Sequence, residues 1–470
     1  MSDASARTHV LGKSADETVS AVSKFSVSGC AKSIAAIVGL ILFFPFSLAV
    51  TLAAFVVKSF AFAMGGGPMA SNGKTVMLSG GKMTKALQLA RLFHRAGYRV
   101  VLCETDDYRF TGHRFSNSVD RFEIVPRCDV PNYADVLCEI AKQSSADFYV
   151  PVCSPYSSYF DSQAKHLLEQ QCKVIHVSSE HIATLDNKFL FAEASKIAGL
   201  LVPQTVLITD VQQVLDFDFS SYRRPFILKS IAYDPVRRLD MTKLPMESAD
   251  AMRRHLTTLP ISESNPWILQ EFIAGREFCT HSTVINGEVR VHVCCQSSAF
   301  QVNYDPVDEP LIEQWIETFC ESLNPTGQLS FDFIQANDDG QFYAIECNPR
   351  THSAITTFYA NDDVADAWFS DQFSGKAVGP ASGNRPTYWI AHEICRISAA
   401  VVRFDFLKAA ERFRIVLHGK EAVFDWRDPM PFLMLHHYHV PALLINAAIA
   451  GRDWLRIDFN IGKLVRAGGD

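Results

Sequence analysis

Short apolar runs and helical stripes alternate along residues 74–180. The stripes place apolar side chains three and four positions apart, as at Ala86, Leu89, Ala90 and Phe93. The apolar runs between them have the length of strands and read TVMLS, YRVVLCE, RFEIVP, DFYVPVC and CKVIHVS. Strands that alternate with helices predict an open parallel sheet, so we expect one α/β domain over residues 74–180.

The pattern changes after this domain. A helix is predicted from Asn187, and apolar strands follow at PFILKS and WILQEFI. Two hairpins come next, turning at residues 286–287 (NG) and 338–340 (DDG). This mixture predicts an α+β domain over residues 181–375, where residues rich in Gly, Pro and Ser mark its end. The aromatic-rich residues 376–470 are expected to pack on the core.

One stretch near the N-terminus is apolar on every face. Residues 33–57 carry no charge and are bracketed by Lys32 and Lys58. The run is long enough to cross a bilayer as a helix. Pro45 would kink such a helix, so a shallow hairpin in one leaflet is an alternative, and a buried core helix is a third.

The chain therefore divides into six predicted parts. A polar disordered tail (1–32) precedes a membrane-associating segment (33–64), and a flexible linker (65–73) follows it. The remaining parts are the α/β domain, the α+β domain and the C-terminal region, with the bounds given above.

Composition and charge limit the classes of partner and the compartment that we expect for this chain. The net charge of −7, without a basic stripe interleaved with aromatic residues, excludes nucleic acid as an expected partner. Twelve cysteines are scattered without CxxC or Cys/His spacing, which predicts reduced thiols in the cytosol. We expect a cytoplasmic catalytic part attached to a membrane. The sequence HHYH at 436–439 has no acid or cysteine at ligand spacing and is interpreted as packing.

The sequence LSGGKMTK at 78–85 resembles a phosphate-binding loop at a strand-to-helix turn. A Walker loop needs glycine five positions before Gly81 and Ser or Thr after Lys82, but the chain has Val76 and Met83 there. The dinucleotide pattern G-x-G-x-x-G is not met either. A helix N-terminus after such a turn still favours an anion, and a tight turn with solvated lysines is the alternative.

The strongest chemical pattern lies in GQLSFDFIQANDDGQFYAIECNPR, which ends at Arg350. With the turn centred on the DDG sequence, Asp332 and Glu346 face each other across the hairpin, and the two-residue period puts Asn348 on the same face. Two carboxylates and an amide suit Mg²⁺, so we predict a magnesium site there. Arg350 would stand beside it as a fork for phosphate or carboxylate. A surface hairpin with solvated acids is the alternative.

A second cluster fits a purine nucleotide. In WILQEFIAGREF, a strand ends at Glu271, Phe272 and Ile273, where exposed backbone could bond a base edge. Glu277 could bind ribose hydroxyls. The positive charges for a polyphosphate would come from Lys188 and Lys229, although each alone is as readily a surface residue.

In this order the motifs resemble the ATP-grasp superfamily of ligases. The pattern is a pre-grasp α/β domain, a helix-start lysine, a strand-end lysine, the hinge E-F-I-x-G-x-E and the acidic D…E-x-N-P-R, over about residues 74–375. The resemblance implies an ATP-grasp fold with ATP and Mg²⁺ as cofactors. It implies ATP contacts at Lys188, Lys229, Glu271, Phe272, Ile273 and Glu277, and metal ligation by Asp332, Glu346 and Asn348. After Lys229 the chain has IAYDPVRR instead of a glycine-rich lid, so catalytic roles are expected for Arg350, Lys229 and the lid residue Arg238.

Within that superfamily the chain is similar to the family of ligases that form mycosporine-glycine. The similarity is carried by SGGKMTKALQLAR, TGHRFSNSVDRF, PVCSPYSSYFDS, ILKSIAYDPVRRLD, EFCTHSTV, SSAFQVNY, AIECNPRTHSAIT and IDFNIGKLV. It implies phosphoryl transfer to the enol oxygen of 4-deoxygadusol, followed by attack of the glycine amine. Substrate contacts are expected from Lys82, Arg114, His281 and His352, with the histidines as candidate bases. A homodimer is one possible assembly.

Three alternatives stay open at this point. One is an ATP-grasp carboxylate–amine ligase that forms an acyl phosphate on another substrate. Another is a kinase or NTPase built on the glycine-lysine loop. The last is a membrane-tethered binding protein with a degenerate grasp fold, although the intact set of Asp332, Glu346 and Asn348 argues against it.

Overall fold

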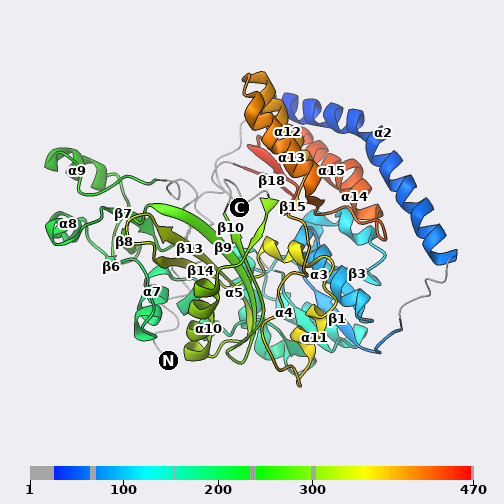
Figure 1. Ribbon diagram of the computed structural model, residues 1–470, viewed down its shortest axis with the longest axis horizontal. Helices are drawn as coiled ribbons and strands as arrows, with labels where there is room; N and C mark the ends of the chain where they lie inside the picture. Colours follow the sequence, from blue (N-terminus) through cyan, green and yellow to red (C-terminus); the bar gives the residue numbers. More distant parts are fainter. Residues whose placement is uncertain are drawn as a thin grey trace.

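Five parallel strands form the first sheet, in the order β3-β2-β1-β4-β5 (Figure 1). The structure is a computed structural model that describes residues 26–63, 70–152, 154–232, 234, 237, 240–297 and 303–466. The strands are β1 (Thr75–Leu78), β2 (Arg99–Thr105), β3 (Arg121–Val125), β4 (Phe148–Val150) and β5 (Lys173–Val174). The predicted open parallel sheet is confirmed.

Helices cover both faces of this sheet because side chains alternate along each strand. Val76 and Leu78 of β1 pack in one apolar cluster with α3 (Thr84–Arg95). Met77 points the other way, into a cluster with α4 (Tyr133–Ser144) and α5 (Pro155–Leu168). The β1–α3 turn therefore lies at the carboxyl end of the central strand, where open α/β sheets bind ligands.

Two antiparallel sheets follow, which confirms the predicted α+β part. The smaller has the order β6-β8-β7 and projects to the left in Figure 1 with its helices α8 (Val211–Leu215) and α9 (Ala249–Leu256). Its strands are β6 (Thr205–Ile208), β7 (Phe226–Ser230) and β8 (Trp267–Glu271). The larger has the order β12-β10-β9-β13-β14.

The larger sheet carries both predicted hairpins. Its strands are β9 (Gly275–Ile285), β10 (Glu288–Gln296), β12 (Pro306–Val307), β13 (Gly327–Ala336) and β14 (Phe342–Asn348). The β9–β10 turn has positive φ at Asn286 (50°) and Gly287 (77°), as the NG signal predicts. Helices α6 (Ser179–Leu185), α7 (Lys188–Ile197) and α10 (Pro310–Leu323) pack against this sheet through a cluster rich in phenylalanine.

The C-terminal region lies against both preceding parts. Its strand β15 (Thr387–Tyr388) pairs with β11 (Asn303–Tyr304) and with β16 (Lys420–Glu421). Arg91 of α3 donates to Asp428 at 2.9 Å, and both side chains are buried. The other elements of residues 353–466 are η4 (Ser353–Phe358), α11 (Val364–Phe369), α12 (Ile390–Val402), α13 (Phe406–His418), α14 (Met430–Met434), η5 (Leu435–His439), α15 (Val440–Ile449), β17 (Arg456–Asp458) and β18 (Lys463–Val465).

A single long helix, α2 (Val27–Ala63), contains the apolar N-terminal segment. It begins before residue 33, inside the stretch predicted to be a disordered tail, and residues 1–25 of that tail lie outside the described residues. Pro45 lies within the helix, which continues on both sides, so the predicted alternative of a hairpin is wrong. The core-helix alternative is also wrong, since most of the apolar side chains of α2 are exposed. Two helical stretches, Val27–Phe60 and Met430–Ile449, are long and apolar enough to cross a membrane.

Candidate active site

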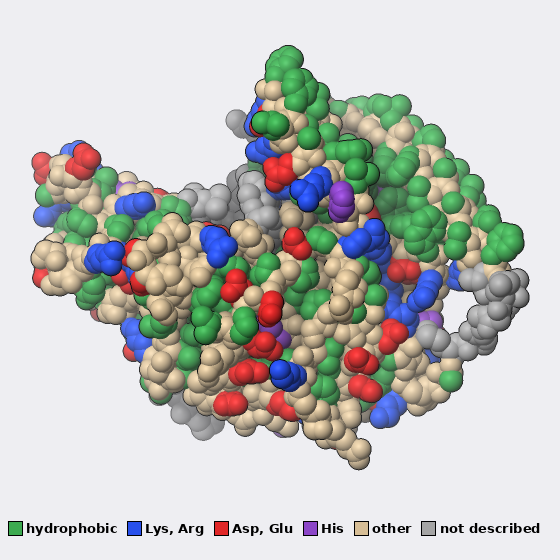
Figure 2. All heavy atoms as spheres, in the orientation of Figure 1, with side chains coloured by type: hydrophobic (Ala, Val, Ile, Leu, Met, Phe, Trp, Pro, Cys, Tyr) green, Lys and Arg blue, Asp and Glu red, His purple; other side chains and the backbone are tan. Residues whose placement is uncertain are grey.

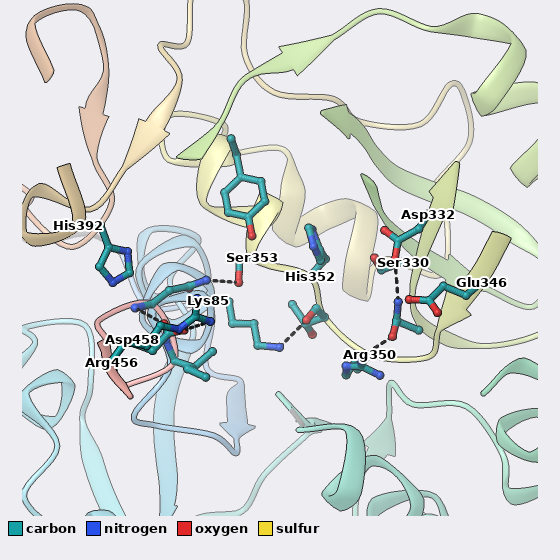
Figure 3. Close-up of a pocket in the computed structure, with 15 residues that line it drawn as sticks. Lys85, Ser330, Asp332, Glu346, Arg350, His352, Ser353, His392, Arg456 and Asp458 are labelled. Carbon is teal, nitrogen blue, oxygen red and sulfur yellow. Dashed lines mark hydrogen bonds and ion pairs between the residues drawn. The ribbon is translucent and has the colours of Figure 1, made fainter. Parts of the chain in front are cut away.

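The acidic hairpin has the register that the sequence predicts. Asp332 of β13 pairs with Glu346 of β14, and Ser330 pairs with Asn348. The Asn348 amide donates to Asp332 Oδ2 at 3.3 Å, so the three side chains share one face of the ladder. Arg350 follows directly and donates to Asn348 Oδ1 (Figure 3).

The protonation of the acidic pair indicates a cation site. Burial raises the pKa of Asp332 well above its usual range, and the Glu346 carboxylate adds to the shift. Burial acts on Glu346 in the same direction, but the ammonium groups of Lys188 and Lys229 outweigh it and lower the pKa of Glu346. Burial of two facing carboxylates disfavours charge on both at once, and a divalent cation would relieve their repulsion. The oxygen-rich set of Asp332, Glu346 and Asn348 fits Mg²⁺.

Two lysines reach this hairpin from other elements. Lys188 is the first residue of α7, whose N-cap Asn187 accepts from two backbone N–H groups. Lys229 lies on β7 of the smaller sheet, and its Nζ donates to Gln270 Oε1 at 2.9 Å. Burial lowers the pKa of Lys229, and Glu346 partly opposes that shift. The structure thus brings lysines from two directions to one acid.

Arg350 is held between two acceptors. One guanidinium nitrogen lies 3.9 Å from Asp186 Oδ1, just before α7, and another donates to Asn348. Burial raises the pKa of Asp186, and the Arg350 charge opposes that shift. The arginine is therefore oriented toward the acidic face before any substrate binds.

The predicted adenine hinge lies at the end of β8. The backbone N–H of Glu271 donates to Gln204 O and that of Phe272 donates to Pro225 O, so neither is offered to a base. The Glu271 side chain lies 3.7 Å from Arg224, which also binds Asp338 and Asp339 of the acidic hairpin. This arginine ties the smaller sheet to the larger one beside the hinge.

Ile273 and Glu277, which follow the hinge strand, differ in burial. Ile273 is buried in a small cluster beneath β13 and β14. Glu277 is exposed on β9 and pairs with Ile334 of β13 in the ladder. Gly275 precedes it, and a Cβ there would lie 1.9 Å from Gln335 O, so only glycine permits this approach of β9 to β13.

A cavity of about 310 Å³ joins the acidic hairpin to the C-terminal region (Figure 3). One end holds Asp332, Glu346, Asn348 and Arg350. The other end is lined by Lys85, Tyr304, His352, Ser353, His392, Arg456, Asp458, Asn460 and Ile461. The cavity therefore has a metal- and phosphate-type end and a second polar end that can receive an organic substrate.

The second end is closed by a loop after β17. Asp458 accepts from the backbone N–H of Asn460 and Ile461 and lies 3.4 Å from Arg456. Asn460 donates to Ser353 Oγ at 2.9 Å, and its carbonyl accepts from the backbone N–H of Thr84 at 2.8 Å. The carbonyl therefore occupies the N-terminus of α3, where an anion would otherwise bind.

The glycine-lysine loop contributes a different lysine from the one predicted. Lys82 lies 3.6 Å from Glu104 and 3.7 Å above the ring of Tyr108, outside the cavity. Lys85 is buried, lines the cavity and donates to Thr351 O at 2.6 Å. The Asn460 carbonyl thus occupies the first N–H of α3, which counts against a phosphate site at this loop and against the NTPase alternative.

The two predicted histidines lie together. His352 lines the cavity, and its backbone N–H donates to Nδ1 of the fully buried His281 at 3.3 Å. Burial lowers the pKa of His352 to about 3, with Lys85 and Arg350 adding to the shift, and burial lowers that of His281 well below its usual range. Both are neutral and weakly basic, so neither is matched to deprotonating an ammonium group.

One other predicted residue, Arg114, does not line the cavity. Arg114 is exposed in η2 (Gly112–Phe115), where it donates to Arg109 O and lies 4.5 Å over the Phe122 ring. Arg238 lies outside the described residues.

Several cavity residues were not found by sequence reasoning. His392 and Arg456 belong to no recognisable motif, Tyr304 ends the similar stretch SSAFQVNY without a role being predicted for it, and Lys85 is interpreted as a solvated neighbour of Lys82. The sequence signal for the second end of the cavity was IDFNIGKLV, which contains Asp458 and Asn460 and is similar to the mycosporine-glycine ligases. Those residues become recognisable only when the C-terminal loop is placed against α3 and η4.

The order of the sheets along the chain can be compared with the predicted fold. A parallel pre-grasp sheet, then a small and a large antiparallel sheet, bring Lys229 and Glu346 to one place from separate sheets. This arrangement agrees with the predicted fold class, in which an open parallel sheet precedes an ATP-grasp part.

The solved structures with similar chains include a synthetase, a ligase and a carboxylase domain. An ADP complex of N5-carboxyaminoimidazole ribonucleotide synthetase has 17% identity and a TM-score of 0.46, covering 62% of this chain and 74% of that chain. An L-amino acid ligase from Bacillus licheniformis has 15% identity and a TM-score of 0.44, covering 63% and 70%. The biotin carboxylase domain of Hydrogenobacter thermophilus 2-oxoglutarate carboxylase has 14% identity and a TM-score of 0.46. The match covers 59% of this chain and 64% of that chain. No family model and no curated protein matches the sequence.

Proposed function

We propose that this protein is an ATP- and Mg²⁺-dependent ligase that joins glycine to 4-deoxygadusol and releases ADP and phosphate. The observation that carries the ligase assignment is the paired Asp332 and Glu346 facing Lys188, Lys229 and Arg350 at one end of a cavity that continues to a second polar end. The sequence similarity to ligases that form mycosporine-glycine supports the choice of substrates.

The first step is phosphoryl transfer. The bond between the γ-phosphorus of ATP and the bridging β–γ oxygen breaks, a bond forms from that phosphorus to the enolate oxygen of 4-deoxygadusol, and ADP leaves. Mg²⁺ held by Asp332, Glu346 and Asn348 supplies charge neutralisation for the phosphates. Lys188 and Lys229 hold the phosphate oxygens, and Arg350 stabilises the charge of the transferred group.

The second step forms the carbon–nitrogen bond. The glycine nitrogen, after losing its proton to solvent, bonds to the ring carbon that carries the phosphorylated oxygen. The carbon–oxygen bond then breaks, phosphate leaves, and the nitrogen loses its remaining excess proton. Lys85 and Arg456 lie at the cavity end where the glycine carboxylate can be bound, and the neutral His352 donates or accepts a hydrogen bond there.

The test is incubation of the full chain with ATP, Mg²⁺, 4-deoxygadusol and separate amino acids. We expect phosphate release that depends on both substrates and a product with the mass of mycosporine-glycine. Phosphate release that requires a carboxylate acceptor instead would replace this proposal by the acyl-phosphate alternative.

A charge-removing variant tests the metal end with a matched control. Glu346→Gln should abolish ADP formation because it removes a metal ligand, and isothermal titration should show weakened Mg²⁺–ADP binding. Glu317→Gln, on the exposed face of α10, should behave as wild type. Full turnover by Glu346→Gln would contradict the assignment.

A further inference from the structure

The long helix α2 has its polarity inverted relative to a helix of a water-soluble protein. Its buried stripe contains the hydroxyl residues Ser33, Ser47 and Thr51, each at most 1% exposed. Its outer face carries large apolar side chains, among them Ile34, Ile41, Leu42, Leu52, Phe55 and Phe60. A helix in water normally buries its apolar stripe and exposes its polar one. The outer face of α2 therefore matches a hydrocarbon environment.

Two of these hydroxyls are hydrogen-bonded, since Ser47 Oγ donates to Phe43 O at 3.2 Å, whereas Thr51 Oγ1 has no partner among the described residues. Ser33 Oγ donates to Gly29 O at 2.8 Å and accepts from Trp454 Nε1 at 3.0 Å. Lys32 pairs with Asp453 at 3.0 Å, near the end of α15. The N-terminal part of α2 is thus fixed to the folded body by specific contacts.

The middle of α2 is also fixed. The ring of Phe43 lies 5.3 Å from that of His436 and 6.3 Å from that of Phe432. The neighbouring stretch Met430–Ile449 is itself packed into the main core through Phe432, Leu435 and Leu444. Because this body lies along α2, the helix cannot cross a bilayer without drawing the core in with it.

The length of α2 agrees with an orientation in the membrane plane. Its 37 residues correspond to about 55 Å, against about 30 Å for the hydrocarbon core of a bilayer. An interfacial helix has no such limit. The length alone permits a tilted spanning helix as well, so it is the attachments of α2 to the folded body that oppose the spanning orientation.

A second apolar surface lies beside the first. Helices α12 and α13 form a hairpin whose tip projects from the body at the top of Figure 2. The tip exposes Val402 (77%), Phe404 (80%) and Leu407 (88%). Phe404 has φ of 58°, a region that asparagine or aspartate enters more readily than phenylalanine. Figure 2 shows apolar side chains over this tip and along the outer edge of the molecule, where α2 lies.

The charges around the tip favour an anionic surface. Residues 390–418 contain five arginines or lysines and three acids. Of the acids, Asp405 caps α13 by accepting from Lys408 N, Glu393 is buried within 3.8 Å of Arg412, and Glu411 is exposed. Arg403, Lys408 and Arg414 remain exposed. Anionic headgroups supply the opposite charge, whereas a second copy of the chain would bring the same cations to the interface.

We propose that the outer face of α2 and the tip of the α12–α13 hairpin form one docking surface that lies in the plane of a single bilayer leaflet and binds anionic lipid. This surface is independent of the ligase reaction. Helix α12 also carries His392, which lines the cavity.

Vesicle flotation of the full chain tests the surface. We expect binding to mixed phosphatidylcholine–phosphatidylglycerol vesicles, weaker binding to phosphatidylcholine alone, and loss of binding with salt. The double variant Phe404→Asp with Leu407→Asp should weaken binding at least about tenfold, because charge at the tip opposes insertion. Aspartate tolerates the left-handed conformation at 404, so the variant keeps its fold by circular dichroism.

The matched control is Ile197→Asp at the end of α7, 86% exposed and remote from both elements. It should float as wild type does. Unchanged flotation of the double variant would overturn the role of the tip. A wild-type chain that stays off vesicles but forms a dimer, lost in the double variant, would show that a second copy is the occupant.

The orientation has its own measurement. Ile41→Trp and Val56→Trp lie about 22 Å apart along the helix. For an in-plane helix, lipids brominated at one shallow depth should quench the added fluorescence of both variants equally. Quenching maxima at clearly different depths would show that α2 spans the bilayer and would overturn the in-plane proposal.

Discussion

Lys82 and Lys85 belong to the same loop, but only Lys85 lines the cavity. The Lys82 ammonium group is neutralised by Glu104 and lies over the Tyr108 ring, while Lys85 lies in the cavity beside His352. We expect Lys85→Met to lower turnover by about 100-fold or more, since a fixed positive charge near the reacting groups is lost. The Kd for ATP, measured by calorimetry, should not change.

Lys82→Met is the matched control for that variant. It removes the same charge from the same loop but outside the cavity, so its kcat should stay close to that of wild type. Its cost should appear as a lower Tm, because Glu104 loses its partner. Equal losses of turnover in the two variants would show that the loop as a whole, rather than Lys85, acts on the substrate.

At the scale of elements, the β1–α3 turn depends on the absence of a side chain. Gly80 has φ of 67°, and a Cβ there would lie 2.1 Å from Val152 O. Gly80→Ala should therefore lower the free energy of unfolding by more than the roughly 1–2 kcal/mol of a left-handed alanine alone. Gly73→Ala supplies that reference, since φ is 76° and no atom lies within 4 Å. Equal losses in urea unfolding would contradict the close approach.

The π-helical turn η5 makes stability depend on pH. His436 is buried between aromatic rings, and burial lowers its pKa to about 4. The unfolded chain, with an ordinary histidine pKa, binds the proton more readily, so this stability is present above about pH 6.5 and falls as the pH decreases.

His436→Phe removes this dependence. Between pH 7 and pH 5 the free energy of unfolding of wild type should decrease by about 2 kcal/mol relative to the variant. Tyr438→Phe, in the same turn and facing Phe110 and Phe115, should show a gap from wild type that does not vary with pH. Urea unfolding at the two pH values measures both. A constant gap for His436→Phe would mean that the residue is accessible to protons in the folded state.

What the sequence predicts well is local. Residue alternation is enough to place Asp332 opposite Glu346, and the NG signal is enough to place the β9–β10 turn, because register and turn chemistry depend on near neighbours. The hairpin alternative predicted from Pro45 is wrong, because packing of α2 along the C-terminal helices keeps the helix continuous. The contribution of Lys85 and the role of Asn460 depend on contacts between residues hundreds of positions apart, which no local pattern contains.

At the scale of the whole molecule, the cavity exists only because distant segments meet. Thr84 donates to Asn460, Asn460 donates to Ser353, and Lys85 donates to Thr351, so three regions share one hydrogen-bonded wall. The metal end comes from the larger antiparallel sheet, and the other end comes from the C-terminal region. We therefore expect ATP and the amino acid to be bound by different parts of the chain.

Two variants at opposite ends of the cavity test this division. Arg456→Gln removes the cation beside Asp458, so the KM for the amino acid should rise about tenfold, as when a charged hydrogen bond is lost, while the KM for ATP stays unchanged. Lys229→Met should do the reverse, since Lys229 lies beside Glu346 on the phosphate side. Steady-state kinetics with each substrate varied separately distinguishes them. If Arg456→Gln raised both KM values equally, the C-terminal loop would act by shaping the whole cavity rather than by binding the amino acid.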